Sequence, residues 1–364
     1  MFQEPISSTY TDLTEEQTRD RIRGLKKELG DKVVILGHHY QRDEIIEHAD
    51  YRGDSYKLAK DAASHPSAEF IVFCGVHFMA ESADILTPET QKVILPNLAA
   101  GCSMADMANN FQVRSAWKQL GETLGAIEGK IIPVTYINSA ANLKAFVGEH
   151  GGTVCTSTNA PKAVKWALEK GEKVLFFPDQ HLGRNTCANL GIDPETEMAL
   201  WDPFKPLGGN TPEKLAQSKA ILWKGHCSVH QRFTVDQIRK AREEHPGIKI
   251  LVHPECPIEV VRESDLFGST EYIINQVKAA PAGSVWGIGT EINLVSRLAK
   301  EHPEQTIVCL DPQICPCSTM YRIHPSYLLW SLDRIAAGEP ANIIEVPQAI
   351  KEPALVALKQ MLEL

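Results

Sequence analysis

The sequence of 364 residues has no excess of positive charge: 37 Lys and Arg residues stand against 46 Asp and Glu residues, a formal net charge of −9. This balance argues against broad binding to a nucleic-acid backbone, and we expect no nucleic-acid partner. Apolar runs of membrane length are also lacking, since the longest, such as residues 70–76, have only the length of a strand. The polar N-terminal segment lacks the apolar stretch of a secretory signal, so we expect a cytoplasmic protein that does not enter a membrane.

Several chemical signatures are missing as well. The sequence contains no pair of C-x-x-C motifs with zinc-ribbon spacing and no ferredoxin-like run of cysteines. It also contains neither a G-x-G-x-x-G fingerprint nor a P-loop. These absences leave a closed structural zinc site weakly supported and nucleotide binding unsupported.

Nine cysteines are nevertheless present, an odd number that cannot pair completely within one chain. Five are expected to be ordinary packing or loop thiols, namely Cys74, Cys155, Cys187, Cys256 and Cys309. The other four lie in polar turns or turns with Gly or Pro, namely Cys102, Cys227, Cys315 and Cys317. Three separate loops can thus each offer one thiolate, and three thiolates leave one iron of a [4Fe–4S] cluster open as a Lewis acid. A redox pair of Cys315 and Cys317, or purely structural thiols, are the alternatives.

Near-continuous apolar runs alternate with helical patterns along the chain, which predicts parallel βαβ units and an α/β fold. Similar runs begin at Lys32, Lys130 and Lys219 and suggest three successive α/β units. We predict helices at residues 45–63, 160–169 and 234–244. We place the domains at residues 1–118 (with an N-terminal helix), 119–212 and 213–338, followed by a C-terminal tail or helix at 339–364. Polar residues follow many of these strands, and the carboxyl ends of parallel strands are where ligands bind.

Many ordered segments over nearly the whole chain resemble one family, quinolinate synthase (quinolinate synthetase A). They include GHHYQRDEI, LAAGCSMAD, VTYINSAA, VCTSTNA, GHCSVH, VHPEC and CSTMYRIHPSYLLWSL. The resemblance implies condensation of iminoaspartate (iminosuccinate) with dihydroxyacetone phosphate to quinolinate, with loss of phosphate and water, in NAD biosynthesis. It also implies three similar three-layer αβα domains around a pseudo-threefold axis. An L-aspartate oxidase or dehydrogenase is the implied source of iminoaspartate.

The resemblance further implies a [4Fe–4S] cluster held by three cysteines, and by motif these are Cys102, Cys227 and Cys317. The additional Cys315, two residues before Cys317, departs from the simple pattern. Glu255 is the expected base, with His253 beside it and Tyr40 as a proton donor. His230 is expected to support the cluster from behind Cys227, and Glu291 to support the cavity.

Two anionic substrates require local hydrogen-bond donors because the chain as a whole is negative. Ser55, Ser157, Ser269 and Thr270 stand near predicted helix starts, where backbone N–H groups favour anions; a plain N-cap is the structural alternative for each. The complete set of expected substrate contacts is His38, Ser55, Tyr136, Ile137, Asn138, Ser157, His253, Pro254, Glu255, Ser269 and Thr270.

Two other functions remain open on the residues alone. One is a hydro-lyase that uses the same three-thiolate cluster on a different small dicarboxylate. The other is an iron–sulfur or thiol sensor that binds metabolites without turnover. The density of His, Tyr, Asn, Ser and Glu at predicted strand ends favours an enzyme, because a sensor needs few acid–base groups.

Overall fold

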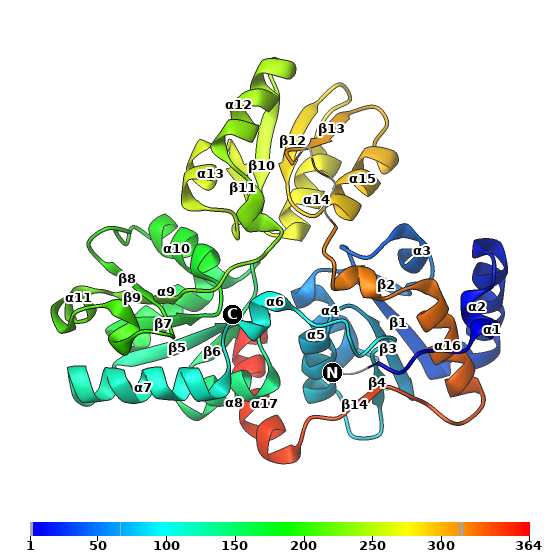
Figure 1. Ribbon diagram of the computed structural model, residues 1–364, viewed down its shortest axis with the longest axis horizontal. Coiled ribbons are helices and arrows are strands. Elements are labelled where there is room, and N and C mark those ends of the chain that lie inside the picture. The colour runs from blue at the N-terminus through cyan, green and yellow to red at the C-terminus, as the bar shows by residue number, and fades with distance from the viewer. Residues whose placement is uncertain (1–2, 66, 312, 314–315) are drawn as a thin grey trace. The chain divides into compact units, whose positions relative to one another are not determined.

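The computed structural model describes residues 3–65, 67–311, 313 and 316–364, which form an α/β protein with three sheets (Figure 1). The chain divides into two compact units. Unit 1 comprises Met1–Cys102, Ile292–Leu294 and Cys315–Pro347, and unit 2 comprises Ser103–Glu291, Val295–Ile314 and Gln348–Leu364. Over the described part of the chain, no helix is both long enough and apolar enough to cross a membrane.

Unit 1 contains one five-stranded sheet of order β14-β4-β3-β1-β2. Its strands are β1 (Val33–His38), β2 (Tyr51–Gly53), β3 (Phe70–Cys74), β4 (Lys92–Ile94) and β14 (Ile343–Ile344). Its helices are α1 (Ser8–Thr11), α2 (Glu15–Leu29), η1 (Gly30–Lys32), α3 (Asp43–Ile46), α4 (Ser55–Ala63), α5 (His77–Leu86), η4 (Met320–Arg322) and α16 (Pro325–Ala336).

Unit 2 contains two sheets, of order β6-β5-β7-β9-β8 and β11-β10-β12-β13. The first comprises β5 (Ile131–Tyr136), β6 (Thr153–Cys155), β7 (Lys173–Phe177), β8 (Met198–Trp201) and β9 (Ala220–Trp223). The second comprises β10 (Lys249–Val252), β11 (Leu266–Phe267), β12 (Val285–Gly289) and β13 (Thr306–Cys309).

The helices of unit 2 connect these strands and cover the sheets, except that the first turn of α15 is grouped with unit 1. Those of the first sheet are α6 (Ser103–Asp106), α7 (Asn110–Leu124), α8 (Ala141–Glu149), α9 (Ala160–Lys170), α10 (Gln180–Asn189), η2 (Pro206–Gly209), α11 (Pro212–Gln217) and α17 (Gln348–Glu363). Those of the second are η3 (His230–Arg232), α12 (Val235–Glu244), α13 (Ile258–Glu263), α14 (Thr270–Ala279) and α15 (Ile292–Glu301).

The same strand order recurs in all three sheets. Apart from the edge strands β14 and β8, each sheet contains a series of four strands. In each series the first strand lies between the second and the third, and the fourth lies beyond the third: β2-β1-β3-β4, β6-β5-β7-β9 and β11-β10-β12-β13. All pairings within these series are parallel. The expected fold class is therefore confirmed: an α/β protein with three parallel-dominated sheets, consistent with a three-layer αβα arrangement.

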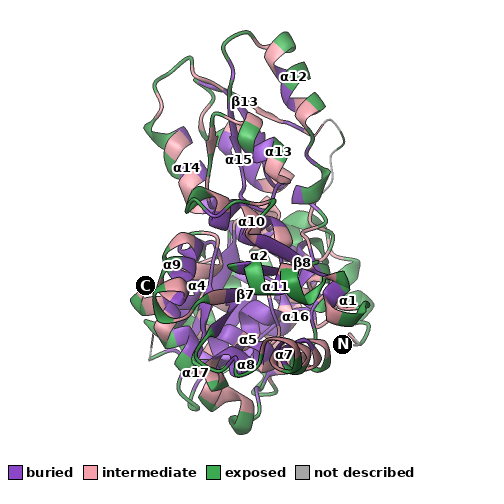
Figure 2. Cartoon of the chain, turned by 90° about the vertical axis from the view of Figure 1, so that its left-hand side faces the viewer, coloured by how far each residue is buried: buried purple, intermediate pink, exposed green. Residues whose placement is uncertain are grey.

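The interior of each sheet is apolar, as the continuous runs predict. Every residue of β5 and β9 is buried, because parallel strands are covered by helices on both faces. Helices such as α12 instead bury one side, Ile238 and Ala241, and expose the other (Figure 2). The core thus lies between strands and inner helix faces, and the loops at the strand ends are left to carry polar groups.

One expectation about the repeat is wrong. The strand after Lys219, Ala220–Trp223, does not begin the third series but pairs with β7 and β8 in the second sheet, and the third series begins at Lys249. Several strands of similar apolar composition follow one another, so composition alone does not identify their partners. The domain boundaries stay a prediction.

A second expectation, one continuous helix over residues 45–63, is also wrong. Tyr51–Gly53 forms β2, which pairs with the end of β1, and the Asp54 side chain then accepts a hydrogen bond from the Lys57 amide to cap α4. The predicted helices at 160–169 and 234–244 are confirmed as α9 and α12.

Candidate functional site

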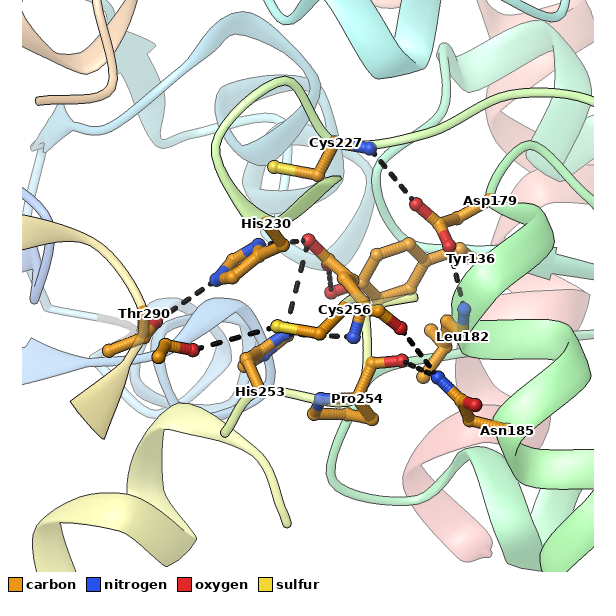
Figure 3. A network of polar contacts seen from close by, with 12 residues as sticks. Tyr136, Asp179, Leu182, Asn185, Cys227, His230, His253, Pro254, Cys256 and Thr290 are labelled. Carbon is orange, nitrogen blue, oxygen red and sulfur yellow. Dashed lines mark hydrogen bonds and ion pairs between the residues drawn. The ribbon is translucent and has the colours of Figure 1, made fainter. Parts of the chain in front are cut away.

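A buried polar network lies at the carboxyl ends of β5 and β10 in unit 2 (Figure 3). Tyr136 is the last residue of β5, and His253 and Glu255 follow β10. The Tyr136 hydroxyl donates a hydrogen bond of 2.6 Å to Glu255 Oε1. The side chains of Tyr136 and Glu255 are both buried, so this bond is strong and well shielded from water.

The second carboxylate oxygen of Glu255 is held by His230, from η3. The distance from His230 Nδ1 to Glu255 Oε2 is 2.7 Å, and the opposite ring nitrogen, Nε2, lies 3.0 Å from Thr290 Oγ1. Since an ionised carboxylate only accepts hydrogen bonds, Nδ1 of His230 carries a proton. Tyr136, Glu255, His230 and Thr290 therefore form one continuous hydrogen-bonded chain.

Glu255 is held in its charged form by these neighbours. Burial by itself would raise its pKa, but the nearby His230 and the hydrogen bonds from His230 and Tyr136 outweigh burial and keep the pKa of Glu255 below its usual range. The site thus contains a buried carboxylate whose charge is compensated by donors rather than by water.

His253 is neutral at physiological pH. Its ring stacks on that of His230 with centroids 4.3 Å apart, and burial together with the charge of His230 lowers the pKa of His253 to about 3. The Glu255 amide donates to His253 Nδ1 over 3.3 Å, so the single ring proton resides on Nε2. His253 can therefore donate a hydrogen bond through Nε2 but cannot accept a proton at Nδ1 without losing the amide contact.

The backbone of the segment from His253 to Cys256 is held by hydrogen bonds to two other parts of the chain. The Asn185 side chain, from α10, donates to the carbonyl oxygens of Pro254 and Cys256, each over 2.8 Å. The His253 amide donates to the Gly289 carbonyl over 3.0 Å. These contacts orient His253 and Glu255 before any ligand binds.

The thiol of Cys227 lies beside this network. One donor atom each from Cys227, His230 and Glu255 falls within 4.8 Å of the others. The Cys227 amide donates over 3.1 Å to Asp179, whose pKa is raised well above its usual range by burial and by the nearby charge of Glu255. Gly225 is required in this turn, because a side chain there would overlap the carbonyl oxygen of Pro178.

In unit 1, other expected residues gather at the end of β1 and the start of α4. His38 is buried, and its Nδ1 accepts a hydrogen bond of 3.1 Å from the Tyr40 amide, with the two rings edge to face at 4.7 Å. Ser55 is the first residue of α4 and is half-buried. It is not the N-cap, since Asp54 fills that role.

A cavity of about 420 Å³ in unit 2 is lined by further expected residues, including Ser157, Pro254 and Ser269. Ser269 is an N-cap, as the structural alternative foresaw: its hydroxyl accepts from the Tyr272 amide over 3.3 Å. Thr270 is buried beside it. Ile137 is buried, and the Asn138 side-chain oxygen is buried without a hydrogen-bond partner among the described residues.

The described cysteines differ in burial and in how readily they ionise. Burial raises the pKa of Cys74 and of Cys187 to about 12 each and that of Cys309 to about 11; it also raises the pKa values of Cys155 and Cys256. Such thiols resist ionisation and are poor ligands. Cys102, Cys227 and Cys317 are half-buried, as Cys309 also is, but they lie in loops rather than at the end of a strand. Their donor chemistry is compatible with a metal cluster, and Cys315 lies outside the described residues.

Three residues of the network were not expected from the sequence: Asp179, Asn185 and Thr290. Asp179 lies two residues after the buried strand β7 and caps α10, a position that N-cap rules could have identified. Asn185 and Thr290 carry no local signal, because their roles depend on contacts with segments far away in the chain.

Acid–base groups lie at the ends of parallel strands, beside a thiol that can bind metal. This arrangement defines the protein as an α/β enzyme with a polar small-molecule site. The particular family follows from comparison with known sequences. The family model described as quinolinate synthetase A protein matches residues 20–363, and the chain belongs to this family.

Curated relatives agree. A protein from Corynebacterium glutamicum named quinolinate synthase is 58% identical over 360 residues, which cover 99% of this chain and 91% of that protein. Proteins of the same name from Streptomyces coelicolor and Bacillus subtilis are 56% and 52% identical, covering 94% and 99% of this chain and 87% and 96% of theirs.

Proposed function

We propose that this chain is a quinolinate synthase that condenses iminoaspartate with dihydroxyacetone phosphate, with loss of phosphate and water, in NAD biosynthesis. The observation that carries the proposal is the chain from Tyr136 through Glu255 to His230, in which ligand atoms of Glu255 and His230 lie within 4.8 Å of that of Cys227. Few metabolite-binding sites need a buried carboxylate with two dedicated proton donors next to a thiol. Relatives named quinolinate synthase support the assignment.

We further propose that the resident cofactor is a [4Fe–4S] cluster held by Cys102, Cys227 and Cys317. Each of these cysteines follows the fourth strand of its series, β4, β9 or β13. When bound, such a cluster supplies a Lewis acid at the iron that has no protein ligand, suited to polarising a hydroxyl or carboxylate oxygen.

A repeated register supports Cys317 rather than Cys315 as the third ligand. Each of the three cysteines is followed by serine and stands seven residues before a helix N-cap: Asn109 for α7, Thr234 for α12 and His324 for α16. Seven residues after Cys315 comes Arg322, which lies inside η4.

The acid–base work falls to residues of the network. Glu255 accepts a proton from the substrate, and Tyr136 or His230, each hydrogen-bonded to its carboxylate, gives its own proton to the substrate and takes a proton back from Glu255. Because the single proton of neutral His253 is on Nε2, this residue donates a hydrogen bond to a developing negative oxygen. Tyr40 supplies a proton from the segment after β1.

Anion binding is assigned to the starts of helices. Ser55 at α4, Ser157 in the loop before α9, and Ser269 with Thr270 at α14 offer hydroxyl and backbone donors where the helix dipole favours negative charge. The Asn138 oxygen can accept a hydrogen bond from a substrate hydroxyl or imine. His38, Ile137 and Pro254 complete the substrate contacts. An L-aspartate oxidase or dehydrogenase is the proposed supplier of iminoaspartate, and the cytoplasm the proposed location.

Anaerobic purification followed by incubation with both substrates tests the function. We expect a brown protein that forms quinolinate, identified by mass. Dehydration of another dicarboxylate without use of dihydroxyacetone phosphate would identify a hydro-lyase instead. Tight binding of the substrates without product would identify a sensor.

Cysteine replacements test the cluster ligands. Cys102→Ser, Cys227→Ser and Cys317→Ser should each bind less iron and lower turnover by roughly 100-fold or more, because several kcal/mol of Lewis-acid stabilisation are lost. Cys309→Ser is the matched control, since Cys309 is half-buried like the proposed ligands but its thiol contacts the Thr290 carbonyl, and Cys315→Ser should also keep the cluster. A fully active, colourless Cys227→Ser protein would refute the cluster.

A further inference from the structure

The segments that follow the three proposed ligands share more than their helix caps. The third and sixth residues after each cysteine are buried, and the fifth makes contacts in every case. The segments read Cys-Ser-Met-Ala-Asp-Met-Ala-Asn from Cys102, Cys-Ser-Val-His-Gln-Arg-Phe-Thr from Cys227 and Cys-Ser-Thr-Met-Tyr-Arg-Ile-His from Cys317. The fifth residues are Met107, Arg232 and Arg322, and we refer to them as the clamp residues.

Arg232, five residues after Cys227, holds the segment that leads to Cys317. Its Nε donates over 3.1 Å to Asp311 Oδ2, and its Nη2 donates over 3.2 Å to Gln313 Oε1. The Asp311 side chain is only 10% exposed, and its other oxygen accepts from the Gln313 amide over 2.9 Å. One guanidinium therefore binds the side chains of both Asp311 and Gln313, a geometry that a single ammonium cannot reproduce.

Arg322, five residues after Cys317, holds the segment that leads to Cys102. Its Nη1 donates over 2.7 Å to the carbonyl of Ala99, three residues before the cysteine. The buried Asn97 completes the connection: its Nδ2 donates over 3.0 Å to the Arg322 carbonyl, and its Oδ1 accepts from the Ala99 amide over 2.9 Å.

Met107, five residues after Cys102, holds the segment that leads to Cys227. Its carbonyl accepts from Trp223 Nε1 over 2.8 Å, and its Sδ accepts from the His226 amide over 3.3 Å. Each clamp contact lies within one unit. The three contacts follow one pattern. The clamp residue after Cys102 contacts residues just before Cys227, the one after Cys227 contacts residues before Cys317, and the one after Cys317 contacts a residue before Cys102.

We infer that Arg232 and Arg322 are positioning residues for the cluster ligands. Arg322 positions Cys102, and Arg232 positions Cys317. This inference rests on the proposed function, because it takes the three cysteines as ligands. Three thiolates on three loops must be ordered together before iron can bind, and ordering each loop costs conformational entropy. Contacts made outside the ligand shell order the loops before the metal binds, and they commonly change metal affinity by about 10- to 100-fold.

Alkylation of the cluster-free full-length protein by iodoacetamide, followed residue by residue by mass spectrometry, tests the inference without using activity. Arg322→Ala should raise the alkylation rate of Cys102 about tenfold or more, as the loss of one charge-assisted hydrogen bond predicts, and leave Cys227 at the parent rate. Arg232→Ala should raise the rate of Cys317 by a similar factor and leave Cys102 unchanged. Arg322→Lys, which keeps one donor, should lie between parent and alanine variant.

Arg239→Ala and Arg334→Ala are matched controls, because these arginines lie on α12 and α16 and their ion pairs among the described residues are with Asp236 and Glu339, on or just after the same helices. They should leave all three rates unchanged. A uniform rise at all three cysteines in the clamp variants would indicate general loosening and would overturn the inference, as would parental rates throughout.

The rate of cluster release to an iron chelator, measured by visible absorbance, provides the second readout. Arg232→Ala and Arg322→Ala should each release iron about tenfold faster than the parent. The controls should match the parent, and parental release from both clamp variants would contradict a role in holding the cluster. If the parent itself binds no cluster while the alkylation pattern holds, the clamps stand and the cluster proposal fails.

Discussion

The decisive residue is Glu255, whose identity was accessible from the sequence but whose environment was not. Its position after a buried strand, next to His253, predicted an acid–base role. The donors from Tyr136 and His230 come from other strands and loops, at 2.6 and 2.7 Å. Hydrogen-bond partners of this kind depend on how separate segments meet, and no local pattern encodes them.

Glu255→Gln is expected to keep the cluster and lower turnover roughly 10²–10⁴-fold. The amide presents a donor where Tyr136 or His230 also donates, so at least one of the two hydrogen bonds is lost. Steady-state kinetics and iron content should be measured together. Glu259→Gln, an exposed change on the first turn of α13, is the control. Near-parental turnover of Glu255→Gln would remove this residue from the mechanism.

The neutral state of His253 predicts a pH dependence of stability. Its pKa is about 3 in the folded chain, against an ordinary 6.5, because of burial and the charge of His230. The stabilisation is thus present above pH 6.5 and is lost as the pH falls towards 3, by about 1.4 kcal/mol per pH unit. Denaturant unfolding of the cluster-free protein between pH 7 and about 5 should show a slope that combines this contribution with those of other histidines whose pKa burial lowers, such as His181. His253→Asn should reduce it, and an unchanged slope would contradict the assignment.

Among the elements, α17 shows how the end of the chain supports the site. The Asn159 side chain donates over 3.0 Å to the carbonyl oxygen of Met361 in α17. Its Oδ1 accepts a hydrogen bond of 2.7 Å from the Thr156 amide. The loop that carries Ser157 is thereby fastened to α17. The helices α9 and α12 were predictable from period and caps, whereas the three-residue strand β2 was too short to interrupt a helical pattern visibly.

Gly148→Ala is expected to destabilise the protein by about 1–3 kcal/mol, as overpacking does. A side chain at Gly148 in α8 would overlap the carbonyl oxygen of Pro353 and push α17 away from α8. Denaturant unfolding measures the change. Gly24→Ala in α2 is the control, because nothing lies within 4 Å of the added carbon. It should be neutral or slightly stabilising, and equal effects of the two changes would contradict close packing at Gly148.

At the scale of the whole molecule, the threefold repetition was recognisable from the sequence, but its register was not. The run after Lys219 resembles the first strand of a series, yet it is β9, the last strand of the second sheet in chain order. Apolar composition reports that a strand is buried, not which neighbour it pairs with. The cysteine register is more informative, because a ligand followed at fixed distance by a helix cap constrains several positions at once.

The composition of unit 1 has a consequence for synthesis. This unit joins Met1–Cys102 with Cys315–Pro347, so β14 and α16 leave the ribosome long after β1–β4. Until then β4 remains an open edge that can pair with other nascent chains. The contact of Arg322 with Ala99 cannot form either. Any cofactor that needs both Cys102 and Cys317 must therefore be delivered to a nearly finished or released polypeptide rather than to an early nascent one.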